Sequence, residues 1–147
     1  MPMTQPFLRA AAFAVLSLIL LAVLSTLLFL FLIGIPKGAD AMASFQAQAA
    51  QLAPTVDLAL GGLILLVCGW LAARPFTGRD AIMTAATMAL LYIVLDVLIV
   101  LTIGDVRQMR LETTGLSYAV KVAGALVGGW LASRTAAAPE AISLDKE

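Results

Sequence analysis

Residues 10–35 read AAAFAVLSLILLAVLSTLLFLFLIGI. This apolar run is interrupted only by Ser17, Ser25, Thr26 and Gly34. A helix that crosses the hydrocarbon core of a bilayer needs about 20 consecutive apolar residues. Lipid offers the backbone no hydrogen-bond partners, so such a segment must be a helix that satisfies its own peptide groups. We therefore predict that residues 10–35 span a membrane.

The same stretch has a second interpretation. Arg9, the apolar run and the sequence Ala41-Met42-Ala43 together resemble a secretory signal with an A-x-A cleavage site. The apolar region of such a signal is usually about 7–15 residues long, and this run is about twice that length. We therefore favour a first span that is retained over one that is cleaved.

Three further segments are also long and apolar enough to cross a bilayer. They cover residues 56–73, 81–103 and 116–132. Together the four segments predict an all-α fold, a polytopic four-helix membrane bundle within residues 1–134. Residues 135–147 are rich in Ala and Pro and then acidic, so we expect them to form a disordered tail.

The composition supports a membrane protein and excludes several kinds of site. Of the 147 residues, 62% are hydrophobic and 12% charged, and the mean hydropathy is +1.03; a soluble domain is about 25% charged. Nine Lys and Arg balance nine Asp and Glu, so no charge excess favours nucleic acid. The chain has no His, and Cys68 is its one cysteine, which excludes an internal disulfide. Without a nucleophile–base set, we expect no enzymatic activity, no cofactor and no metal site.

Lys and Arg in the connecting segments indicate the orientation of the bundle. One side of the predicted topology carries Arg9, Arg74, Arg79, Arg134 and Lys146. The other side carries Lys37, Arg107 and Arg110. This bias places both termini in the cytoplasm. The outer side then has one loop over residues 36–55, compatible with a short surface helix over residues 41–52, and a second over residues 104–115.

The second and fourth spans end in similar sequences. Residues 66–74 read LVCGWLAAR and residues 126–134 read LVGGWLASR. A duplication would give two helical hairpins in the same orientation, related by a pseudo-twofold axis along the membrane normal. The alternative is that Trp beside Arg is ordinary anchoring at the membrane interface. The anchors are then Trp70 with Arg74 and Trp130 with Arg134.

Small residues recur at helical spacing on three of the spans. Such stripes allow helix backbones to approach closely in a membrane, where no hydrophobic drive brings helices together. We expect them to pack inside the bundle by default, although contacts between two copies are the alternative. They are Gly61, Gly69 and Ala73 on the second span, Ala81, Ala85 and Ala89 on the third, and Gly124, Gly128 and Ala132 on the fourth.

Asp96 and Lys121 are charged residues well inside the third and fourth spans. At 1.5 Å per residue, both lie roughly 8–10 Å below the outer interface. Neighbouring antiparallel helices would bring them together, and either charge alone would cost several kcal/mol in the membrane. We therefore predict an Asp96–Lys121 ion pair. Asp57, near the start of the second span, is expected to interact favourably with the helix dipole.

Three more polar residues, Tyr92, Ser117 and Tyr118, share the interface of the third and fourth spans with this pair. One interpretation is a buried ion pair that fixes the register of the helices, with the hydroxyl groups completing its hydrogen bonds. The other is a substrate or proton site, because ionisable residues inside membranes are often functional.

From about Gly34 onward the chain resembles a family of small bacterial four-span membrane proteins of unknown function. The resemblance rests on LDVLIVL at residues 95–101, GLSY at residues 115–118, the charged turn Arg74–Asp80 and the longer first outer loop. Asp96 matches an Asp in the third span of that family and Tyr118 an aromatic in its fourth, whereas Lys121 has no counterpart. The resemblance implies a four-span fold in a bacterial inner membrane and no particular activity.

Two classes of function fit these observations. The first, which we favour from the sequence, is a structural or partner-binding membrane subunit, present as a homodimer or in a larger complex. The second is a minimal transporter or channel, also dimeric, that uses Asp96 with Lys121 as an ion or proton site. Small four-span multidrug exporters rely on a carboxylate in their first span, and this chain has none there. A cavity that reaches Asp96 would favour the second class, and a dry Asp96–Lys121 pair the first.

Overall fold

The computed structural model describes residues 4–103 and 111–135. These residues form helices and connecting turns, with no strand among them. The helices are α1 (Thr4–Ile33), α2 (Ala39–Ala73), α3 (Gly78–Ile103) and α4 (Leu111–Thr135). All four are long and apolar enough to cross a membrane. The prediction of an all-α, multi-pass four-helix bundle is confirmed.

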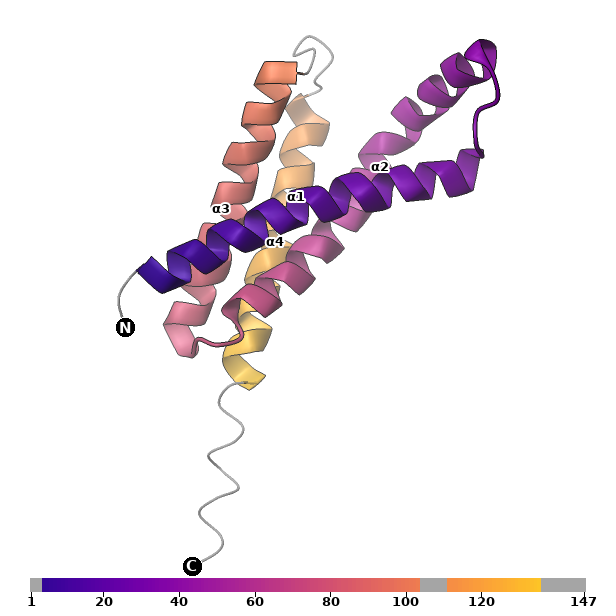
Figure 1. Ribbon diagram of the computed structural model, residues 1–147. Helices are drawn as coiled ribbons and strands as arrows, with labels where there is room; N and C mark the ends of the chain where they lie inside the picture. Colours follow the sequence, from indigo (N-terminus) through magenta and orange to yellow (C-terminus); the bar gives the residue numbers. More distant parts are fainter. Residues whose placement is uncertain (1–3, 104–110, 136–147) are drawn as a thin grey trace, which may run out of the picture.

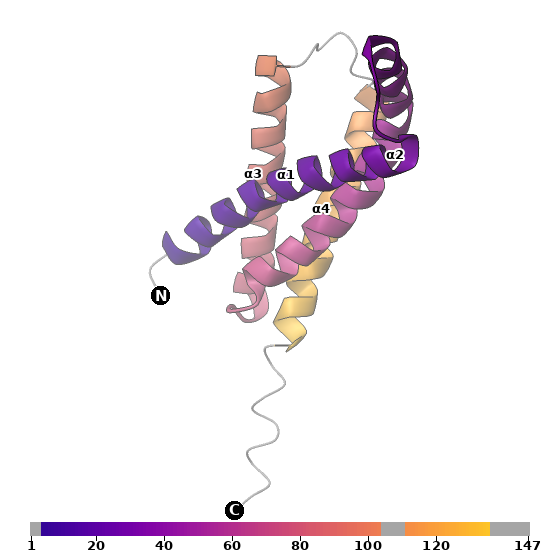
Figure 2. The ribbon, with the colours of Figure 1, turned by 45° about the vertical axis from the view of Figure 1, so that its right-hand side comes forward.

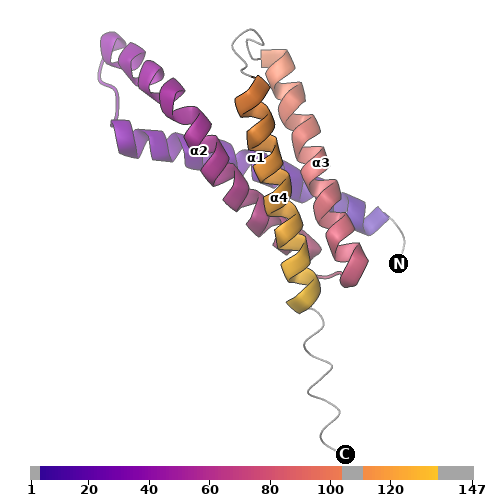
Figure 3. The same ribbon diagram turned by 180° about the vertical axis from the view of Figure 1, so that it is seen from behind.

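Helix α4 lies between α2 and α3 at the upper end of the bundle, and toward the lower end α2 crosses α4 to reach the start of α3 (Figures 1 and 2). Helix α1 crosses the other helices obliquely on one side (Figures 1 and 2). From the opposite side, α2 and α4 run next to each other in the same direction, with α1 behind them (Figure 3). The most extensive contact is between α2 and α4, and α1 packs against α2 and α3. The parallel course of α2 and α4 agrees with two hairpins in one orientation; the duplication itself stays a prediction.

Glycines bring α2 and α4 into close contact. A Cβ atom on Gly69 would lie 2.7 Å from the carbonyl oxygen of Ala125, and one on Gly124 would lie 2.5 Å from that of Gly62. Gly128 likewise lies directly against the backbone of α2. These separations leave no room for side chains, so the backbones themselves touch. The glycine stripes of both spans therefore lie inside the bundle.

The buried core consists largely of small side chains, which suits helices that approach closely. Its members in contact include Ala10 and Ala14 of α1, Leu65 and Cys68 of α2, Met88 and Tyr92 of α3, and Ala125 of α4. A second buried group consists of four alanines, Ala73, Ala81, Ala85 and Ala132. In the apolar 18-residue segment of α1, only 11% of the residues are buried, against 44% in the corresponding segment of α2. Most of α1 is therefore exposed on the surface of the bundle.

The start of α2 differs most from the sequence-based expectation. The loop expected over residues 36–55 does not form, because α2 already begins at Ala39 and includes the segment expected to be a surface helix. Ala, Gln and Leu, which dominate that segment, favour helix. Pro54 lies inside the helix, where it removes the N–H that would have bonded to the carbonyl of Ala50, an exposed residue, and its ring crowds that carbonyl.

A short connection replaces the expected loop. Residues 34–38 join α1 to α2 and include Gly34 and Gly38, whose φ angles of 94° and 99° are open to glycine and strained for other residues. The charged turn expected over Arg74–Asp80 is shorter in the structure: residues 74–77 join α2 to α3, and Arg79 and Asp80 lie in the first turn of α3.

The remaining boundaries concern α4. This helix begins at Leu111, before the expected start near Leu116, and it ends at Thr135. Most of the second outer loop, residues 104–110, and the tail after Thr135 lie outside the described residues.

Candidate functional site: a polar cavity between α2, α3 and α4

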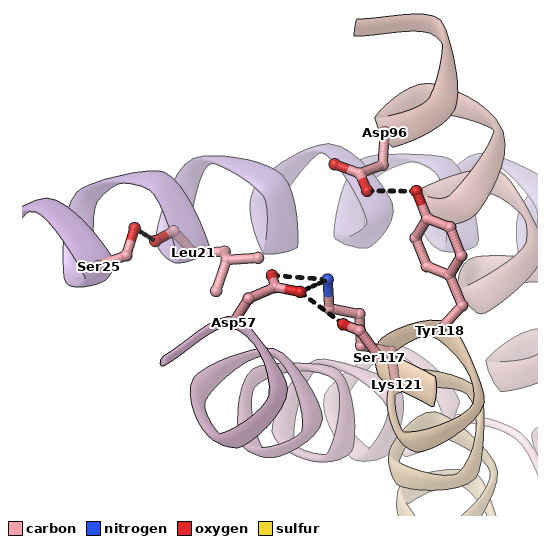
Figure 4. Close-up of polar contacts among 7 residues, drawn as sticks. All are labelled: Leu21, Ser25, Asp57, Asp96, Ser117, Tyr118 and Lys121. Carbon is pink, nitrogen blue, oxygen red and sulfur yellow. Dashed lines mark hydrogen bonds and ion pairs between the residues drawn. The ribbon is translucent and has the colours of Figure 1, made fainter. Parts of the chain in front are cut away.

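Asp57 lies near the middle of α2, because that helix begins at Ala39. The expectation that Asp57 interacts with the positive end of the helix dipole is therefore wrong, since that effect falls off within the first turn. Its carboxylate points instead toward α4 (Figure 4).

The buried Lys121 of α4 pairs with Asp57. The Lys121 ammonium Nζ lies 2.7 Å and 2.9 Å from the two carboxylate oxygens of Asp57. Ser117, one turn earlier on α4, donates its hydroxyl to the same carboxylate. Lys121 is only 2% exposed, and its methylene stem lies against Gly61, where a side chain would collide with it. The ion pair and the hydroxyl together tie α2 to α4.

The predicted Asp96–Lys121 ion pair is wrong. Lys121 shares a stripe of α4 with Gly124 and Gly128, and this stripe is the one that packs against α2. The ammonium is therefore directed to α2, while Asp96 projects from α3. Asp96 accepts a hydrogen bond of 2.8 Å from the Tyr118 hydroxyl instead. No Lys or Arg among the described residues forms an ion pair with Asp96.

Two tyrosine rings flank the Lys121 ammonium. Its Nζ lies 5.3 Å from the ring centroid of Tyr92 and 5.6 Å from that of Tyr118. Both separations fall within the range of cation–π attraction. Tyr92 is fully buried, and its hydroxyl has no hydrogen-bond partner among the described residues. Tyr92 therefore interacts with Lys121 through its ring and not through its hydroxyl.

These groups surround a cavity of about 280 Å³. Three charged residues line it: Asp57, Asp96 and Lys121. The rest of its wall consists of Ala53, Pro54, Thr114, Ser117 and Tyr118. Such a volume is large enough for several water molecules. With all three groups ionised, two carboxylates face one ammonium. The cavity then carries one excess negative charge, and that charge belongs to Asp96.

The structure brings together all the polar residues that the sequence indicated for this region. Sequence reasoning assigned Asp57 to the helix dipole and missed its pairing with Lys121, although a signal for the pair was present. Lys121 aligns with Gly61 in the repeat, and Asp57 lies four residues before Gly61, on the same helix face. A small residue opposite a buried lysine, with a carboxylate one turn away, is the pattern that would have identified the pair.

The residues expected at the membrane interface lie at the opposite end of α2 and α4. The Arg74 guanidinium lies 5.4 Å from the ring of Trp70, and the Arg134 guanidinium lies 4.1 Å from that of Trp130. The corresponding residues of the two similar segments thus make the same type of contact. Within residues 4–103 and 111–135, no cluster of His, Cys, Asp and Glu could hold a metal ion.

No protein-family model matches the sequence, and neither a curated protein nor a solved structure is significantly similar to it. The resemblance to small bacterial four-span proteins therefore stays a prediction, and the geometry of the cavity carries the functional argument.

Proposed function

We propose that the protein is a small carrier or channel of the bacterial inner membrane and that Asp96 binds the transported cation or proton. One observation carries this proposal. Asp96 lines a cavity inside a membrane-spanning bundle, and its one hydrogen-bond partner among the described residues is the neutral Tyr118 hydroxyl. An ionised carboxylate in that position attracts a positive charge.

The other two charged groups of the cavity pair with each other, so Asp96 is the carboxylate that remains to bind a cation or proton. Asp57 and Lys121 neutralise each other through two short contacts, and Ser117 adds a hydrogen bond to the carboxylate. Such a pair is a stable part of the bundle, since each member satisfies the other. Asp96 has no such counter-ion among the described residues, so binding of a small cation or a proton from the cavity would offset its charge.

The proposal includes a topology. The excess of Lys and Arg on one side supports cytoplasmic termini. The cavity, which is lined by the early part of α4, then opens toward the outer half of the bilayer. A carrier of this size would work as a homodimer in the lipid bilayer, without a cofactor and without enzymatic activity.

A second candidate function is a structural or partner-binding membrane subunit. The specific observation in its favour is the Lys121–Asp57 pair, which joins α2 to α4 at a buried position. In this function Asp96 and its cavity have no role in flux. The two candidates therefore predict different flux for a variant in which Asp96 has lost its charge.

The test is ion flux in proteoliposomes loaded with a pH-sensitive dye. Gradients of Na⁺, K⁺ or methylammonium are imposed, each with and without a protonophore that converts uncoupled cation flux into a pH change, and internal pH is followed for the wild type and for Asp96→Asn. Asparagine keeps a carbonyl acceptor for Tyr118 and removes the charge. The matched control is Asp40→Asn, the same substitution in the exposed first turn of α2.

We expect flux with the wild type and with Asp40→Asn, and flux at the level of empty vesicles with Asp96→Asn. Two results would overturn the proposal. One is a wild-type signal equal to that of empty vesicles under all three gradients and under a pH gradient alone. The other is undiminished flux through Asp96→Asn.

A further inference from the structure

Two grooves lie at the end of the bundle where α1 begins and α2 turns into α3. The first, of about 520 Å³, lies between α1 and α3 and is lined by Phe7, Phe76, Met83, Thr87, Arg79 and Asp80 among others. The second, of about 480 Å³, includes Arg9 in its wall and shares Phe76 with the first. We call the first one the α1–α3 groove. It is distant in the fold from the polar cavity, which lies toward the other end of α2 and α4.

Arginines gather at this end of the bundle, and most of them are already engaged. Arg74 and Arg134 lie against tryptophan rings. Arg9 donates hydrogen bonds of 3.0 Å to the carbonyl oxygens of Leu71 and Ala72, and so completes the C-terminal turn of α2.

Arg79 differs from the other three. It is exposed at the rim of the α1–α3 groove and makes no hydrogen bond or ion pair with the described residues. Its guanidinium can therefore receive a ligand without losing an existing contact.

The walls of the α1–α3 groove are suited to a hydrocarbon chain. Phe7 and Met83, each 54% exposed, line it together with Phe76. From Arg79 to Thr87 the groove follows α3 for about 12 Å, the rise of eight helical residues, away from the charged end. On α3 the groove is lined by Arg79, Asp80, Met83, Thr84 and Thr87, so its apolar wall comes from Met83 together with Phe7 and Phe76. In a bilayer, a lipid acyl chain is the apolar occupant that the membrane itself supplies.

We propose that the α1–α3 groove is a binding site for an anionic phospholipid. The acyl chain lies along Phe7, Phe76 and Met83, and the phosphate lies on Arg79. A guanidinium matches phosphate through paired hydrogen bonds. The positive end of the α3 dipole, close to Arg79, adds to the attraction. Asp80 in the first turn of α3 opposes it and limits the affinity.

The test compares lipids with the same acyl chains and different head groups. Native mass spectrometry of the purified full chain in detergent measures bound phosphatidylglycerol and phosphatidylcholine for the wild type and three variants. Arg79→Gln removes the proposed phosphate ligand. Arg134→Gln is the matched control, because it removes the same charge at the same end and lies outside the α1–α3 groove. Asp80→Asn removes the opposing charge.

We expect the wild type to prefer phosphatidylglycerol by about fivefold, the factor that corresponds to about 1 kcal/mol for one basic residue near an anionic lipid. Arg79→Gln should lose this preference, Arg134→Gln should keep it, and Asp80→Asn should increase it. Shielding of the buried Cys68 thiol from a maleimide verifies that each variant is folded.

Three results would overturn the assignment. Equal binding of both lipids by the wild type would remove the head-group preference. An equal loss of the phosphatidylglycerol preference in Arg79→Gln and Arg134→Gln would show that the preference depends only on net charge. Complete displacement of phosphatidylglycerol by millimolar inorganic phosphate would show that the acyl chain contributes nothing to binding.

Discussion

Replacing Asp57 by Asn should destabilise the bundle considerably more than replacing Asp96 by Asn. Removing one partner of a buried ion pair costs about 3–5 kcal/mol, because the other charge stays buried without compensation. Lys121 is almost fully buried, but the Asp57 side chain is 37% exposed. Because this exposure lets solvent screen the pair, we lower the expected cost of Asp57→Asn to about 2–3 kcal/mol. Asp96→Asn only converts the Tyr118 bond to a neutral one, which costs about 1 kcal/mol or less.

A double-mutant cycle with Lys121→Met separates the two aspartates. Removing both Asp57 and Lys121 charges leaves no unpaired ion, so the double variant should recover most of the loss caused by Asp57→Asn. The expected coupling energy between Asp57 and Lys121 is about 2 kcal/mol. That between Asp96 and Lys121, which share Tyr118 without forming an ion pair, should be smaller, about 0.5–1 kcal/mol.

The assay uses the one cysteine of the chain as its reporter. Cys68 is 1% exposed in the core, so a maleimide reaches it when the bundle opens. The fraction labelled in detergent, measured against denaturant concentration, gives the free energy of unfolding for each variant. A coupling of Lys121 to Asp96 that equals or exceeds its coupling to Asp57 would refute the reasoning. Unchanged stability of Asp57→Asn would refute it as well.

Further predictions concern packing at the α2–α4 contact. Gly61→Ala should cost about 1–3 kcal/mol because its methyl group would occupy the space of the Lys121 stem. Gly115→Ala, a control with open space around it, should leave stability unchanged or raise it by up to about 1 kcal/mol; equal losses in both variants would contradict the packing argument. Gly128→Ala should cost about 1–3 kcal/mol in the same labelling assay, because it pushes the two helix backbones apart. Native Cys68 should react far more slowly than the unfolded thiol, and a native labelling rate equal to the unfolded one would disprove its burial.

The positions of the four spans follow from local properties of the chain. Runs such as residues 10–35 are so apolar that lipid burial and backbone hydrogen bonding leave the helix as the one suitable structure. The small-residue stripes could also be assigned to helix contacts in advance, because glycines one turn apart have few other uses in a membrane span. These inferences depend on each segment by itself.

The boundary of α2 shows where local reasoning fails. Pro54 and the polar glutamines around residues 46–51 are typical of a loop outside the membrane. The chain nevertheless continues as helix through them, although Pro54 removes one hydrogen bond and crowds the preceding turn, since most residues of this segment are good helix formers. This boundary had a direct consequence for the site, since a helix that began near Val56 would have placed Asp57 at its positive end.

The sequence by itself determined an all-α membrane bundle and a polar interface on its last two spans. Apolar length, charge depth and helical spacing suffice for that, since each is a property of one segment. Only the tertiary structure decided that Lys121 pairs with Asp57 and that Asp96 is left with Tyr118 at the cavity. The position of a charge along a helix determines how deep it lies in the membrane, but not which residue it pairs with. Its partner depends on how neighbouring helices are rotated about their axes, and here the glycine contacts of α2 and α4 set that rotation.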